Sequence, residues 1–92
     1  MRISDTDINK ILDSVPIVDV VSKSVTLRRS GVNYFGCCPF HDEKTASMCV
    51  SPSKRIFKCF GCGEHGNVIW FVSKIEGISY GEAAKKLAAE YN

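Results

Sequence analysis

Two pairs of potential metal ligands constrain this chain more than any other feature of its sequence. Cys38 and His41 form a C-x2-H pair, and 17 residues separate this pair from the C-x2-C pair of Cys59 and Cys62. Three thiolates and one imidazole fill the four positions of tetrahedral zinc and leave none for water or substrate. The pattern therefore predicts one structural Zn²⁺ held by these four side chains, and no catalytic residues.

The other cysteines and the second histidine receive simpler interpretations. Cys37 stands one position too far from His41 to form the same pair, Cys49 lies in a short apolar run, and His65 follows Cys62 closely. We expect a loop residue at His65 and a strand residue at Cys49. A disulfide framework is less consistent with the sequence, because five cysteines are an odd number and we expect no signal peptide. Zinc in a reducing compartment fits better.

Length and composition limit the classes of function. The 92 residues predict one small domain, 1–92, that gains stability from a metal ion and is too small for a large enclosed active site. No apolar run approaches the roughly 20 residues of a membrane span, so we expect no membrane partner. Asp42-Glu43 is the only adjacent acidic pair in the sequence, so the acidic cluster that holds Mg²⁺ in a polymerase is not expected here.

Positive charge is concentrated in the middle of the chain. Residues 23–58 carry seven basic and two acidic side chains, a net charge of +5, whereas the whole chain carries +2. A basic segment with interleaved aromatic residues suits single-stranded nucleic acid, because bases stack on rings while Lys and Arg meet phosphates. The candidate contact residues are Arg28, Arg29, Tyr34, Lys44, Lys54, Arg55, Phe57 and Lys58.

The same residues admit a second interpretation. Tyr34 and Phe57 are also side chains that a small core would use, and a basic surface often only keeps a small protein in solution. Period-two alternation places Arg55 and Phe57 on one face of their strand and Lys58 on the other. The alternation by itself leaves open which of the two faces meets solvent.

Apolar periodicity predicts helices at both ends of the chain and strands in its middle. Two short helices are expected over about 4–22, divided at Pro16, and two more over about 67–91, with a stop near Gly77 and a capping box from Ser79 to Glu82. The expected sheet covers about 25–59, with strands at 25–29, 32–35, 47–51 and 55–58. The predicted fold class is α+β: a small zinc ribbon with an antiparallel β-sheet and flanking α-helices.

Four segments that together cover most of the chain carry a family resemblance. They are Pro16–Val21, Leu27–Tyr34, Gly36–Thr45 and Phe57–Ile69. With both ligand pairs, these segments resemble the N-terminal zinc-binding domain of bacterial replicative DNA primases, a CHC2-type zinc ribbon. The resemblance implies the same four zinc ligands and a domain that engages the single-stranded DNA template. A separate polymerase domain, expected outside these residues, would then make the RNA primer.

The resemblance also implies a cellular setting. The expected partners are the primase polymerase domain, in cis or in trans, and the replicative helicase through the wider protein, in the bacterial cytoplasm near the nucleoid. The sequence departs from the family pattern after Lys44-Thr45, where Ala46, Ser47 and Met48 stand in place of the usual proline, serine and phenylalanine. The departure concerns the template-reading surface and is consistent with a mobile element or a divergent lineage.

Two alternatives come from other classes of protein. His41-Asp42-Glu43 is an H-x-E motif, and with the later C-x2-C it resembles zinc nucleobase deaminases, where zinc activates water and the glutamate moves protons. Lys58 stands where that signature has proline, however, and Cys38 would occupy the open coordination position that the reaction needs. The other alternative is a zinc ribbon that binds only protein.

Overall fold

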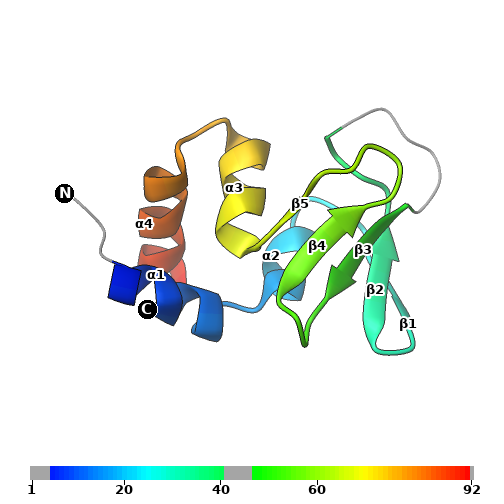
Figure 1. The fold of residues 1–92 in the computed structure, drawn as a ribbon, viewed down its shortest axis with the longest axis horizontal. Coiled ribbons are helices and arrows are strands. Elements are labelled where there is room, and N and C mark those ends of the chain that lie inside the picture. The colour runs from blue at the N-terminus through cyan, green and yellow to red at the C-terminus, as the bar shows by residue number, and fades with distance from the viewer. Residues whose placement is uncertain (1–4, 41–46, 92) are drawn as a thin grey trace.

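The computed structural model describes residues 5–40 and 47–91, and within these ranges two helices precede a sheet and two follow it. In chain order the elements are α1 (Asp5–Ser14), α2 (Ile17–Ser22), β1 (Arg28–Ser30), β2 (Asn33–Gly36), β3 (Met48–Ser51), β4 (Ile56–Cys59), β5 (His65–Gly66), α3 (Val68–Glu76) and α4 (Tyr80–Tyr91). The strands form one antiparallel sheet in the order β1-β2-β3-β4-β5, with the helices beside it (Figure 1). This arrangement confirms the predicted α+β class.

Local signals set the ends of the helices, as the sequence predicts. Pro16 has no N–H to donate, so α1 ends before it and α2 begins after it. Asn67 caps α3 by accepting a hydrogen bond from the Trp70 amide at 2.9 Å, and Gly77 ends that helix with a left-handed φ of 65°. Ser79 accepts a hydrogen bond from the Glu82 amide at 3.2 Å and begins α4.

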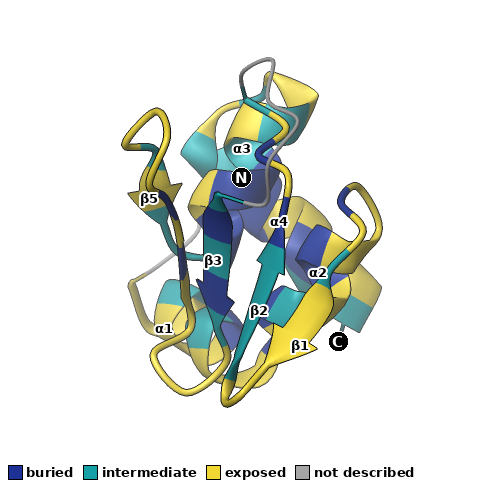
Figure 2. Cartoon of the chain, turned by 90° about the vertical axis from the view of Figure 1, so that its right-hand side faces the viewer, coloured by how far each residue is buried: buried dark blue, intermediate teal, exposed yellow. Residues whose placement is uncertain are grey.

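The sheet has an inner face that packs against the helices. Cross-strand pairing places Tyr34, Val50, Phe57 and Gly66 in one row of this face. Val50 and Phe57 are fully buried, and α2 and α3 contact β3 and β4 respectively. Figure 2 looks onto the opposite, outer face, with the helices behind the strands. The inner face therefore forms one side of the hydrophobic core.

Phe57 is a core residue, and this position corrects its expected role in nucleic-acid binding. Its ring lies 5.8 Å from the ring of Phe40 and 5.4 Å from that of Phe71, measured between centroids, and none of the side chain is exposed. A base cannot stack on a ring that is enclosed between the sheet and α3. The prediction that Phe57 contacts nucleic acid is therefore wrong.

Three details of the sheet differ from the sequence-based expectation. The first strand begins at Arg28, because the segment before it turns to pack over Gly36, where an added Cβ would lie 2.7 Å from the Thr26 carbonyl oxygen. Arg55 lies in the β3–β4 turn with a φ of 58°, and its guanidinium pairs with Asp13 at 3.2 Å. The short strand β5 was not predicted.

Across the described ranges, no helix combines the length and apolar character needed to cross a membrane.

Replacing the buried ring should test this core. Phe57→Ala is expected to lower the free energy of unfolding by about 3–5 kcal/mol, because the loss of a buried aromatic ring leaves a cavity. Phe60→Ala is the matched control, since its ring is 68% exposed, and it should change stability by no more than about 0.5 kcal/mol. Urea unfolding of the metal-loaded chain measures both variants, with Phe57→Leu as a milder substitution. Equal losses from the two alanine variants would contradict the burial of Phe57.

Candidate metal centre and outer sheet face

Three of the four predicted zinc ligands meet at one end of the sheet. Cys59 is the last residue of β4, Cys62 lies in the turn that follows, and Cys38 lies just beyond the end of β2. Strands β2 and β4 both pair antiparallel with β3, so they run in the same direction and end at the same edge. The topology of the sheet therefore brings the two cysteine motifs together.

The geometry of the sulfur atoms fits a tetrahedral zinc ion. The Sγ atoms of Cys38, Cys59 and Cys62 all lie within 4.8 Å of one another, and those of Cys38 and Cys62 are 3.8 Å apart. Ligands at a zinc–sulfur distance of about 2.3 Å in a tetrahedron stand about 3.8 Å from one another. The three thiols can thus occupy three corners around one ion. His41, the expected fourth ligand, lies outside the described residues.

Backbone amides hold the two ligand loops around these sulfurs. The Cys62 amide donates to the Cys59 sulfur at 3.5 Å, and the Phe40 amide donates to the Cys38 sulfur at 3.4 Å. Gly63, whose φ of 81° is easily adopted only without a side chain, donates to the Cys59 carbonyl at 2.9 Å. The two amides that donate to sulfur stabilise negative charge on it, and the thiolate is the form that binds a metal.

The buried cysteines differ in how readily they become thiolates. Burial raises the pKa of Cys38 to about 12, although the Phe40 amide partly offsets the effect. Burial also acts to raise the pKa of Cys59, but hydrogen bonds from the Cys62 amide and the Ser47 hydroxyl outweigh it and lower that pKa to about 6. The donors around Cys59 therefore favour its thiolate, whereas burial favours the protonated thiol at Cys38, and both must be deprotonated to bind a metal.

The remaining thiols and the second histidine stand apart from this cluster of described ligands. Cys37 is exposed, and Cys49 lies half-buried in β3, as expected of a strand residue. His65, which was expected in a loop, lies in β5, and its Nδ1 is 3.0 Å from the Gly63 carbonyl oxygen. Because the carbonyl oxygen can only accept, this contact places a proton on Nδ1.

An exposed row of residues crosses the outer face of the sheet. Cross-strand pairing places in it, from β1 to β5, the residues Arg28, Phe35, Cys49, Lys58 and His65. We call these five residues the outer row. At about 4.8 Å between strands, the row spans roughly 19 Å. All five side chains are exposed or half-buried, and none is acidic. The surface is therefore basic at Arg28 and Lys58 and aromatic between them.

The structure distributes the predicted nucleic-acid contacts over several places. Arg28 and Lys58 share the outer row, whereas Arg29 and Tyr34 are paired in the row of the inner face. The Arg29 Nε donates to the Gly31 carbonyl at 3.2 Å. Lys54 and Arg55 lie together in the β3–β4 turn, at one end of the sheet. The last candidate, Lys44, is outside the described residues.

Two aromatic residues of this surface were missed from the sequence. Phe35 is half-buried in the outer row, and Phe60 is 68% exposed in the turn between Cys59 and Cys62. The Lys58 Nζ lies 5.4 Å from the centroid of the Phe60 ring, so these two side chains are neighbours. Position within the C-x2-C turn was a usable signal for Phe60. Phe35 had no comparable signal. It follows Tyr34, alternation places these two aromatic residues on opposite faces, and the sequence does not show which face meets solvent.

Comparison with known proteins gives consistent matches over most of the chain. Residues 3–92 match the family model described as CHC2 zinc finger. The chain is 56% identical over 89 residues to a DNA primase of Geobacillus stearothermophilus and 54% identical over 90 residues to one of Clostridium acetobutylicum. These matches cover 97% and 98% of the chain but only 15% of each relative.

A solved structure is similar in fold as well as in sequence. The crystal structure of the Aquifex aeolicus primase, containing its zinc-binding and RNA polymerase domains, aligns with a TM-score of 0.88 at 53% identity. The alignment covers 92% of this chain and 21% of that one. The shared part is therefore one small portion of a much longer protein in each of these relatives.

The metal centre leads to a direct prediction. Cys59→Ser should lose zinc and most of the folded structure, because structural zinc contributes on the order of 10 kcal/mol or more to folding. Cys49→Ser is the control, since Cys49 is a half-buried cysteine outside the cluster. Elemental analysis should give one zinc per chain for the wild type and for this control. A chelator-treated chain with an unchanged near-UV spectrum would disprove the structural role.

Proposed function

This chain belongs to the CHC2 zinc finger family, and from that premise we propose that it is the zinc-binding domain of a DNA primase and engages the single-stranded DNA template. In this proposal a polymerase domain elsewhere in the protein, acting in cis or in trans, makes the RNA primer. The zinc ion is structural: it joins the loops that follow β2 and β4. The observation that carries the template role is the outer row, an exposed basic and aromatic surface without acidic side chains.

The composition of the outer row suits a flexible single strand. Arg28 and Lys58 stand on different strands of one face, at a spacing that several consecutive phosphates can meet. Phe35 lies between them and offers a ring on which an unpaired base can stack. Phe60 extends this surface toward the metal centre, where the Lys58 ammonium lies over its ring.

The metal centre supports this surface indirectly. Phe60 lies within the turn between Cys59 and Cys62. The position of its ring therefore depends on the sulfur cluster and on the hydrogen bond from the Cys62 amide to the Cys59 sulfur. Phe40 follows Cys38 by two residues and packs against Phe57 on the inner face. A folded metal centre thus keeps both the core and the exposed aromatic turn in place.

The two alternatives receive less support. The Cys38 sulfur clusters with those of Cys59 and Cys62, which leaves no open position for a catalytic water once His41 also binds. That arrangement does not suit a deaminase, and the relatives that match most of the chain are named DNA primases. A ribbon that docks only protein is distinguished by the binding experiments that follow.

Removal of a positive charge from the outer row should weaken binding to single-stranded DNA and make that binding less dependent on salt. Arg28→Ala and Lys58→Ala are each expected to lower affinity and to reduce the slope of log K against log salt by roughly 0.7, the value for one phosphate contact in a single strand. Lys85→Ala is the matched control, because it removes the same charge from an exposed position of helix α4. Fluorescence anisotropy of a labelled oligonucleotide at several salt concentrations gives the slopes.

Removal of the Phe35 or the Phe60 ring should act on base stacking instead. Phe35→Ala and Phe60→Ala are each expected to weaken binding by about 1–3 kcal/mol while leaving the salt slope unchanged. Thermal unfolding of both variants separates a loss of binding from a loss of folded protein. If all four outer-face variants bind DNA like the wild type, a protein-docking ribbon becomes the better account.

A further inference from the structure

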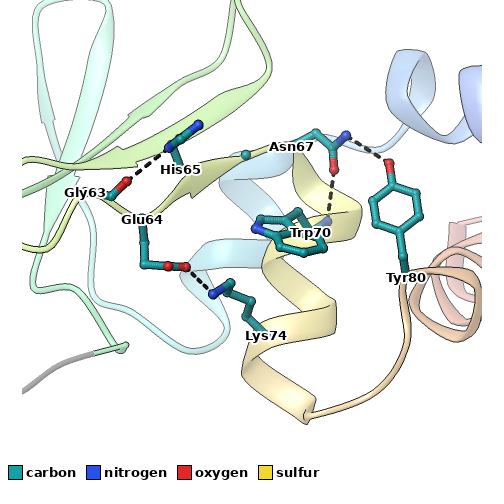
Figure 3. A pocket seen from close by; sticks show the side chains of 8 residues that line it. Gly63, Glu64, His65, Asn67, Trp70, Lys74 and Tyr80 are labelled. Atoms are coloured by element: carbon teal, nitrogen blue, oxygen red, sulfur yellow. Dashed lines mark hydrogen bonds and ion pairs between the residues drawn. The ribbon is translucent and has the colours of Figure 1, made fainter.

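A hollow lies beside edge strand β5, and its lining begins at Gly63, the residue that follows Cys62. Its volume is ≈ 490 Å³, and its walls include Trp70 and Tyr80, the Glu64–Lys74 ion pair and the backbone of Gly66. Volumes of roughly 300–1,000 Å³ are usual for small-ligand sites. Figure 3 shows Trp70 between the Glu64–Lys74 pair and Tyr80. The hollow can therefore accept a flat ring together with its attached sugar.

The indole of Trp70 is held in position but is not covered. It rests on the backbone of β5, since a Cβ added to Gly66 would lie 2.5 Å from the Trp70 Cδ1 atom. The Lys74 ammonium is 5.6 Å from its ring centroid, and the Tyr80 ring is 6.2 Å away and tilted by 45°. Trp70 remains 39% exposed. A large, oriented and accessible aromatic ring is a good stacking surface.

One amide side chain connects the two aromatic walls. The side-chain Oδ1 of Asn67 accepts a hydrogen bond from the Trp70 backbone amide at 2.9 Å. The side-chain NH₂ group of Asn67 donates to the Tyr80 hydroxyl oxygen at 3.0 Å. The start of α3 and the first residue of α4 are thereby held in a defined relation. The spacing of the two rings is consequently built into the fold and does not depend on a ligand.

The charges in the hollow favour an uncharged ring over a phosphate. The Lys74 ammonium pairs with the Glu64 carboxylate at 2.5 Å, so its positive charge is already balanced. A phosphate entering here would meet that carboxylate. A nucleobase, in contrast, can stack on the indole and donate an N–H to a carboxylate, as cytosine does through its exocyclic amine. The chemistry of the hollow therefore suits an unpaired base.

The hollow continues the path of the outer row past the edge of the sheet. His65 is the β5 member of the outer row and also lines the hollow. We propose that this site takes one unpaired base of the same single strand that crosses the outer row, with Trp70 as its stacking platform. The inference rests on the proposed function, because it requires a single strand on the outer face, and it adds a base-binding site beyond that face.

The chain contains a single tryptophan, so its emission reports on this site alone. The zinc-loaded chain is titrated with oligodeoxycytidylates of about 4–12 nucleotides, the range of single-strand site sizes. Longer oligonucleotides should quench Trp70 emission. An abasic residue is then moved through a quenching oligonucleotide one position at a time. The quench should disappear at one position, while anisotropy shows that the DNA is still bound.

Affinity measurements on variants complete the test. Trp70→Ala should bind DNA roughly 5- to 150-fold more weakly, the equivalent of one lost stacking contact, whereas Trp70→Phe should keep most of the affinity. Val32→Ala is the matched control, because Val32 is 76% exposed in the turn between β1 and β2, at the other edge of the sheet. It should bind like the wild type.

The outcomes separate this proposal from the one on which it rests. Unchanged Trp70 emission at saturating DNA overturns the base site. The base site is also overturned if Trp70→Ala binds DNA with wild-type affinity while Lys58→Ala binds weakly. In that case the template function stands, and the Trp70–Tyr80 pair is better explained as a protein contact. If neither Trp70→Ala nor Lys58→Ala weakens binding, both proposals fail together.

Discussion

The approach of two turns at one end of the sheet is the constraint on which the rest of this structure depends. Strands β2 and β4 run in the same direction with β3 between them, so the turns after them emerge side by side. Their sulfur atoms come within reach of one ion. A domain of 92 residues has a small core, and a metal ion held between these turns would fix strands that the core alone holds weakly.

The core and the metal centre form one packed unit. Phe40, two residues after Cys38, contacts both Phe57 on the sheet and Phe71 on α3. Movement of the ligand loop would therefore disturb the aromatic contacts that attach α3 to the sheet. The outer face depends on the same unit, because its residues alternate along the strands with those of the core. Through this coupling, a structural metal at the cysteine cluster would also fix the position of the outer face.

Features that depend on neighbouring residues could be predicted from the sequence. The break at Pro16, the cap at Asn67 and the stop at Gly77 follow from the backbone chemistry of single residues, and the structure has all three. The β-strand at His65–Gly66 could not be predicted, because two residues have no periodicity and pair only where β4 offers an edge. The base-binding hollow likewise joins side chains from β5, α3 and α4.

The sequence by itself determined the fold class, the family resemblance and a set of candidate metal ligands, because ligand spacing and turn chemistry are local properties. Only the tertiary structure decided which aromatic side chains meet solvent. Alternation in a strand allows either of its two faces to be the buried one, and Phe35 and Phe57 are chemically identical side chains. Packing of α3 over β4 selects one solution, which buries Phe57 and leaves Phe35 in the outer row. That choice depends on contacts between segments far apart in the chain, and no short stretch of sequence contains it.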